Sequence, residues 1–85
     1  MERKRTIRIR SALDVARTFL LLSRNHVSAG AIERALGSLT HAGAACQEAG
    51  MLLETWEHPE ADEYREHLAD IERQMRELWE TVEAG

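Results

Sequence analysis

Residues 32–56, IERALGSLTHAGAACQEAGMLLETW, carry the pattern that decides the predicted fold. Apolar or small residues recur every three or four positions, which is the period of a helix with one buried face. This seam comprises Ile32, Ala35, Leu39, Ala42, Cys46, Ala49, Leu53 and Trp56. Gly37, Gly43 and Gly50 lie beside the seam, and each costs a helix about 1 kcal/mol relative to alanine. We expect a neighbouring helix to approach closely here, because small side chains let two backbones come together.

A second seam follows in residues 59–83, PEADEYREHLADIERQMRELWETVE. Its spacing of four and three is typical of coiled-coil-like packing. The seam comprises Tyr64, Leu68, Ile71, Met75, Leu78 and Val82. Pro59 favours a helix that begins there, and the acidic residues just after it suit the positive end of the helix dipole. Glu72 and Arg76 are four residues apart, a spacing that predicts an ion pair on the outer face.

The sequence before these two seams predicts a shorter helix and a basic arm. Residues 11–23 begin with a capping-box pattern, Ser11-Ala12-Leu13-Asp14, and continue with apolar positions on a broad arc. Residues 24–27 are interpreted as the connection, and Ser28 as the N-cap of a second helix over 28–56. Five of the nine residues 2–10 are basic. Residues 6–10 alternate polar and apolar side chains, so the arm over 1–10 is predicted to be either disordered or a short strand.

These elements predict an all-α fold with a single helical domain over residues 11–85. The helices at 28–56 and 59–83, joined by a tight turn, are expected to form a long antiparallel hairpin with large side chains facing small ones. The helix at 11–23 would cover one open side and complete a three-helix bundle. A chain of 85 residues buries only about 60% of its unfolded surface. Self-association is therefore expected, and a dimer is favoured.

The charge distribution, the cysteine content and the lengths of the apolar runs indicate the expected cellular location of the chain. Residues 1–24 carry seven basic and two acidic groups, a net of +5, whereas residues 54–85 carry three basic and eleven acidic groups, a net of −8. The single cysteine, Cys46, cannot form an intrachain disulfide. The longest apolar run, residues 19–22, is far shorter than a membrane span, and the basic start lacks the apolar stretch of a secretory signal. A cytoplasmic protein without membrane contact is expected.

No residue pattern specifies an enzyme, a cofactor or a metal. Glu54 with His58 and Glu63 with His67 have helical i,i+4 spacing, but their neighbours are acidic and exposed, so surface pairing is the better interpretation. Cys46 occupies a seam position and is interpreted as a small buried residue. We expect no catalytic residues, no cofactor-binding residues and no metal ligands.

Two functional hypotheses from different classes remain. The first is a non-enzymatic helical protein that binds another protein, as an adaptor, regulator or inhibitor. Aromatic and large apolar side chains at a helix edge are frequent interface anchors. The candidate interface residues are Trp56, Met75, Leu78 and Trp79.

The second hypothesis is DNA binding through the N-terminal segment. Residues 5–36, with the alternating Thr6-Ile7-Arg8-Ile9-Arg10, a helix, a turn near Asn25 and a second helix, resemble the ribbon-helix-helix repressors. The resemblance implies a strand that pairs with a second copy and enters the major groove, with Thr6, Arg8 and Arg10 facing bases. Arg17 stands where that family has an apolar residue, and Asn25 stands in place of its glycine.

Overall fold

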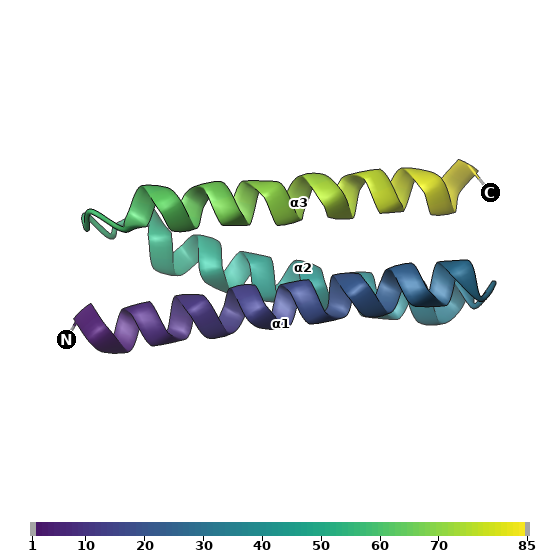
Figure 1. Cartoon of the computed structure of the whole chain (residues 1–85), viewed down its shortest axis with the longest axis horizontal. Coiled ribbons are helices and arrows are strands. Elements are labelled where there is room, and N and C mark those ends of the chain that lie inside the picture. Colours follow the sequence, from purple (N-terminus) through teal and green to yellow (C-terminus); the bar gives the residue numbers. More distant parts are fainter. Residues whose placement is uncertain (1, 85) are drawn as a thin grey trace.

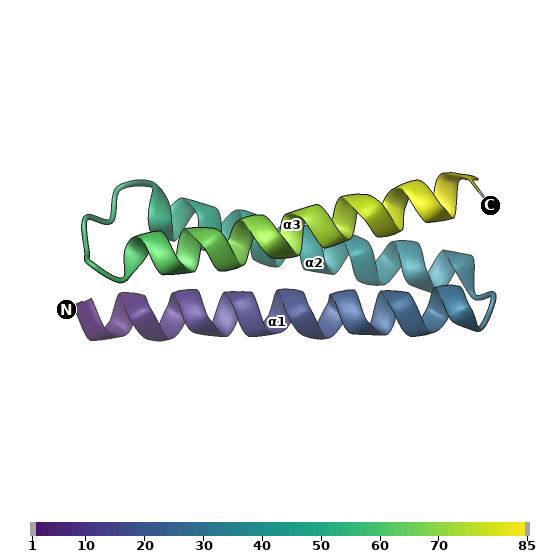
Figure 2. The same ribbon diagram turned by 45° about the horizontal axis from the view of Figure 1, so that its top comes forward.

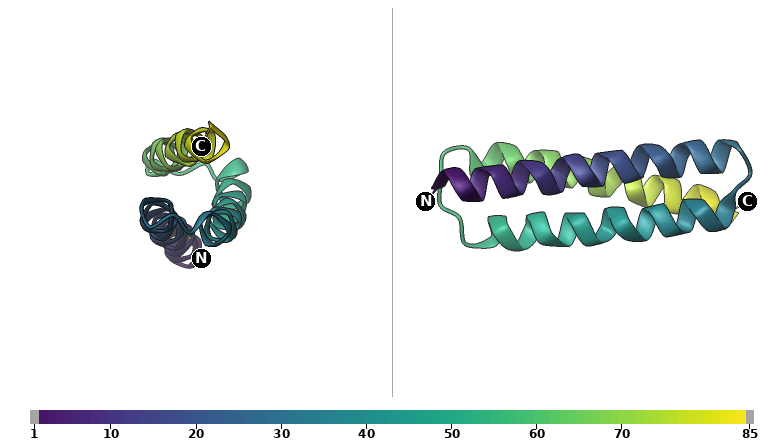
Figure 3. Two further views of the ribbon diagram at one scale, coloured as in Figure 1. Left: turned by 90° about the vertical axis from the view of Figure 1, so that its right-hand side faces the viewer. Right: turned by 90° about the horizontal axis from the view of Figure 1, so that it is seen from below.

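The described part of the chain folds into three α-helices arranged side by side. The structure, a computed structural model, describes residues 2–84, with side chains from residue 4 onward. Over these residues it contains α1 (Glu2–Ser28), α2 (Ile32–Glu54) and α3 (Ala61–Ala84), and no strand. The helices run up, down and up in a rod with extents of 44 × 18 × 14 Å (Figures 1 and 2). Seen end-on they occupy the corners of a triangle (Figure 3). The all-α prediction is confirmed.

The basic arm is part of α1, so the expectation of a strand or a disordered segment at 1–10 is wrong for the described residues. Ile9 is fully buried. It lies four residues before Leu13, on the helix face that also buries Leu13, Ala16 and Leu20. The helical period therefore overrides the alternation of residues 6–10, and Ile7 is left 59% exposed on the opposite side. Met1 and Gly85, which the predicted arm and domain included, lie outside the described residues.

The turn between α1 and α2 lies later than residues 24–27, which are helical. Gly30, at φ +77°, ends α1. The amide of Gly30 donates to the carbonyl of Val27 at 3.0 Å, and the amide of Ala31 donates to the carbonyl of His26 at 2.8 Å. This pair of bonds is a Schellman motif, in which glycine takes the left-handed position. Ser28 is thus the last residue of α1 and not an N-cap, and α2 begins without a side-chain cap.

The connection between α2 and α3 spans residues 55–60. Arg65 of α3 forms hydrogen bonds with this connection and with the last turn of α2. The guanidinium of Arg65 donates to the carbonyl oxygens of Leu53 at 2.8 Å and Trp56 at 3.2 Å. It also pairs with Asp62 at 2.9 Å. The last turn of α2 contains no basic residue, so Arg65 from the next helix places a positive charge at the negative end of the α2 dipole. The Leu53 carbonyl also accepts from the amide of Trp56 at 3.3 Å. Helix α3 begins at Ala61, two residues after the predicted start at Pro59.

The closest helix pair is α1 with α2, and α3 contacts both of them less extensively. The expected hairpin of α2 with α3 is therefore not the main packing unit. Both members of the α1–α2 pair carry small residues at the contact, which include Ala12, Ala16, Ala45 and Ala49. The hydroxyl of Ser23 on α1 reaches the carbonyl oxygen of Ala35 on α2 at 3.3 Å. The small residues of α2 thus do let a neighbour approach, but that neighbour is α1.

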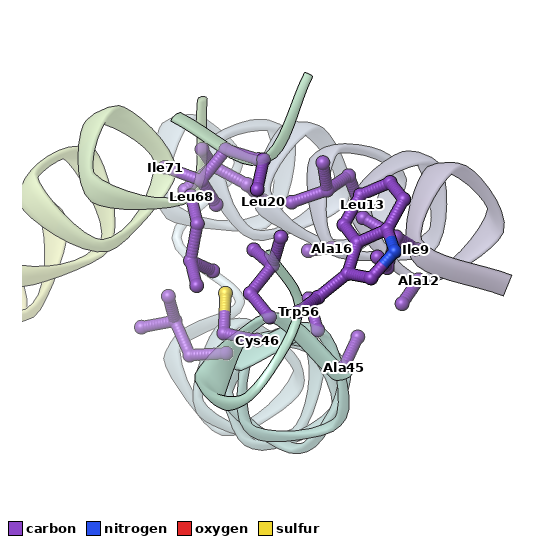
Figure 4. Packing of buried hydrophobic residues seen from close by; sticks show 14 residues of the cluster. Ile9, Ala12, Leu13, Ala16, Leu20, Ala45, Cys46, Trp56, Leu68 and Ile71 are labelled. Carbon is purple, nitrogen blue, oxygen red and sulfur yellow. The ribbon is translucent and has the colours of Figure 1, made fainter. Parts of the chain in front are cut away.

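The hydrophobic core lies toward the end of the rod that holds the α2–α3 connection. Ile9, Leu13, Leu53 and Ile71 are almost fully buried, and Trp56 joins them (Figure 4). The indole of Trp56 points from the end of α2 toward α1 (Figure 4). Along α3, Ile71 is the last buried residue among those described. The second half of α3 therefore lies against the other helices without being covered.

Candidate functional site

The uncovered half of α3 and the facing side of α2 form an open groove, called the α2–α3 groove below. Its volume is about 370 Å³. Its lining residues are Leu39, Thr40, Gly43, Cys46 and Gln47 from α2, and Glu72, Met75, Arg76 and Trp79 from α3. The floor is apolar and the rim carries one acid and one base. Such a surface suits a helix or side chain of a protein partner more than a small polar substrate.

The shape of the groove follows from side-chain size on α2. A Cβ at Gly43 would lie 3.7 Å from the Cε atom of Met75, so the methionine occupies the space that a larger residue would need. The Sγ atom of Cys46 lies 3.6 Å from the Sδ atom of Met75. Met75 thus fills the bottom of the groove, and Trp79, one turn further along α3, remains at its edge.

The charges at the groove belong to Glu72 and Arg76, which are both exposed. Within residues 4–84 neither side chain forms an ion pair, so the predicted i,i+4 pair is absent there. Burial, with a further contribution from the Glu72 carboxylate, raises the pKa of the Cys46 thiol from 9.0 to about 11. The thiol is therefore protonated at neutral pH, and its reactivity as a nucleophile is low.

The structure separates the four candidate interface residues. Trp79 is 44% exposed, and Met75 and Leu78 are partly buried beside the core. Trp56, in contrast, is 5% exposed and stacks on His58 with ring centroids 4.7 Å apart. Its apolar area is covered within the chain, so Trp56 contributes no exposed surface for a partner. Three of the four residues therefore lie together on the second half of α3.

Thr6, Arg8 and Arg10 lie on α1, and the strand that the ribbon arrangement requires is absent from residues 2–84. On a helix, positions two apart point in different directions, so Arg8 does not share a face with the other two. Arg8 instead approaches Glu48 of α2 at 3.8 Å. Residues 2–84 therefore do not have the geometry that the repressor resemblance implies.

The histidines lie in surface or ring contacts. His67 lies 3.8 Å from Glu63 and accepts a hydrogen bond from Arg17 of α1 at 3.2 Å, on the exposed edge between α1 and α3. His41 stacks on Phe19 with centroids 4.9 Å apart. Among the described residues, no three His, Cys, Asp or Glu side chains gather in a way that would hold a metal ion. No described helix combines the length and the apolar character that crossing a bilayer requires.

Glu72 and Arg76 were expected on the outer face of their helix, whereas they flank the groove. Positions 72, 75, 76 and 79 share one helix face, which is the sequence signal for this location. The outer face of α1 also exposes Ile7, Val15 and Leu22. Val15 and Leu22 lie beside the buried face of Ile9, Leu13, Ala16 and Leu20 and are not covered by another helix.

Comparison of this chain with protein-family models, with curated proteins and with solved structures finds no match.

Proposed function

We propose that this chain is a non-enzymatic helical module that binds protein through the α2–α3 groove and associates with itself there. The observation that carries the proposal is the end of the core at Ile71, after which α3 continues for three turns with large apolar side chains incompletely covered. Exposed tryptophan beside a well-formed apolar depression is typical of interface anchors. The unreactive state of the Cys46 thiol also supports a binding role for the groove over a catalytic one.

The chain is elongated, with extents of 44 × 18 × 14 Å and a Cα radius of gyration of 13.8 Å, against about 12 Å for a compact chain of this length. Because of this shape its accessible surface, 5913 Å² for a 9.7 kDa chain, exceeds the roughly 5,100 Å² of a compact monomer of that mass. The uncovered half of α3 is part of this extended surface.

The test is the solution mass of the purified chain as a function of concentration, by sedimentation equilibrium. Concentrations from about 1 µM to about 1 mM cover association free energies of about −8 to −4 kcal/mol. The wild type is expected to shift from monomer to dimer in this range. Trp79→Ala is expected to move the transition to at least about tenfold higher concentration, which is the usual cost of removing a hot-spot aromatic.

Ile7→Ala is the matched control, because Ile7 is a similarly exposed apolar residue that does not line the groove and lies in a separate depression between α1 and α2. Its dissociation constant is expected to equal that of the wild type. A wild type that remains monomeric across the range would refute the proposal of self-association. Dissociation by Ile7→Ala but not by Trp79→Ala would place the interface on α1 and refute the assignment of the groove.

A further inference from the structure

We propose that two copies of this chain pair through the α2–α3 groove around a two-fold axis near Met75. Trp79 of each copy enters the groove of the other, and Glu72 of each copy pairs with Arg76 of the other. This inference rests on the proposed self-association and specifies its geometry. The occupant of the groove is thus a second copy of the chain, in an isologous arrangement.

The groove is self-complementary in shape. A two-fold interface requires one patch to contain both the projecting group and the recess that receives it. Trp79 lies at the edge of the groove, and Met75 of the same chain fills its bottom beside Gly43 and Cys46. The groove remains open above Met75. The Trp79 side chain of a second copy enters this open part.

The groove is also self-complementary in charge. Glu72 and Arg76 lie four residues apart on the same face of α3, and within residues 4–84 neither forms an ion pair. In an antiparallel crossing of two α3 helices centred on Met75, each Glu72 lies opposite Leu78 of the other copy, displaced from its Arg76 by about 3 Å along the helix axis. The two long side chains can span the gap between the helices. Two ion pairs form from four charges that the single chain leaves unpaired.

A partner whose charges all have one sign would pair with only one of the two charged residues at the rim of the groove. An acidic helix would be repelled by Glu72, and a basic helix would be repelled by Arg76. A second copy satisfies both charges, because it brings one Arg76 and one Glu72 on the same helix face.

The test uses charge-reversal variants mixed in pairs. Glu72→Arg places two arginines on the rim, and Arg76→Glu places two glutamates there. Each variant alone is expected to raise the dimer dissociation constant by about tenfold or more, because like charges then face each other across the axis. An equimolar mixture of the two variants is expected to recover an affinity within about threefold of the wild type, because every facing pair is again of opposite sign.

Glu66→Arg is the control for the change in net charge, because Glu66 is exposed and, by its helical position, lies on the side of α3 away from the groove. It is expected to leave the dissociation constant within about twofold of the wild type, since only long-range repulsion changes. Far-ultraviolet circular dichroism of each variant at low concentration verifies that the monomer remains helical. A variant that loses its helicity is replaced by the neutral pair Glu72→Gln and Arg76→Gln, which are each expected to weaken the dimer by a few fold.

The outcomes separate this geometry from the broader proposal. If the wild type dimerises but Glu72→Arg behaves like Glu66→Arg, the two-fold pairing is wrong and self-association stands. If both reversals weaken the dimer but their mixture does not recover it, Glu72 and Arg76 do not face each other and the geometry is again wrong. If the wild type never dimerises, the proposed self-association itself is refuted.

Discussion

Arg65→Met removes the guanidinium that joins the end of α2 to the start of α3, and we expect it to destabilise the monomer measurably. Three hydrogen bonds are lost. Two go to the carbonyl oxygens of Leu53 and Trp56 at 2.8 and 3.2 Å, and the third goes to the exposed carboxylate of Asp62 within α3. Bonds from a charged donor contribute about 1.5–3 kcal/mol each when buried. The side chain of Arg65 is 44% exposed, so solvent reduces the expected total to about 1–2 kcal/mol.

A domain of this size is stable by roughly 4–13 kcal/mol, so the Arg65→Met loss is a sizeable fraction. It corresponds to a fall in Tm of about 5–10 °C. The measurement is urea unfolding followed by circular dichroism, at a concentration low enough to keep the chain monomeric. Methionine retains the unbranched stem and a similar helix propensity, so the variant removes chiefly the polar group.

Arg73→Met is the matched control, because Arg73 contacts only Asp70 and Glu77 on the surface of α3 itself. Exposed pairs of this kind contribute less than about 0.5 kcal/mol on average. Equal losses from Arg65→Met and Arg73→Met would show that the contact across the connection adds nothing to the stability of the bundle, and would refute the role assigned to Arg65.

Further predictions concern burial, backbone and the thiol. Ile71→Ala should cost about 2–4 kcal/mol in urea unfolding, as a large buried side chain does, and Leu78→Ala markedly less because Leu78 is only partly buried. Gly30→Ala should lower stability by about 1–2 kcal/mol, because the backbone at Gly30 has a positive φ. Gly37→Ala, at a position within α2 where a Cβ would face open space, should raise stability by about 0.5–1 kcal/mol. The same change in stability from both substitutions would contradict the turn geometry. The pKa of Cys46 is raised to about 11, so iodoacetamide should modify it far more slowly in native protein than in urea at pH 8–9. The stability that comes from the protonated thiol should be complete below about pH 9 and be lost as pH rises through about 11.

The helical class and part of two seams could be predicted from sequence because periodicity is a local property. The seam residues from Ala35 to Leu53 are buried as expected, and so are Leu68 and Ile71. The predicted seams extend further than the burial, because Ile32 is 41% exposed and the seam positions after Ile71 are at most partly buried. The partner of each seam could not be predicted in this way. Alanines on α2 permit the close approach of any helix. That α1 is the helix that approaches depends on where its own alanines lie along the rod relative to those of α2.

The N-terminal segment shows why local patterns can compete. Residues 6–10 satisfy a strand period and a helix period at once. Only the continuation from Ile9 to Leu13 and beyond distinguishes them, because a long helix buries Ile9 against α2 while a short strand has no partner within the chain. Likewise, Gly30 was a stronger helix terminator than the polar residues 24–27, since its left-handed backbone closes the hydrogen bonds at the end of α1.

The end of the core at Ile71 divides α3 into two parts with different opening free energies. The side chains of residues 61–71 pack into the core and keep this part of α3 from opening locally. Exchange of its amide hydrogens therefore requires unfolding of most of the bundle. Amide hydrogens in residues 72–84 are protected mainly by the backbone hydrogen bonds of the helix. This segment can fray without exposing the core. If a second copy covers Met75 and Trp79, protection of these amides becomes dependent on protein concentration. Hydrogen exchange along one helix would then report association and global folding separately.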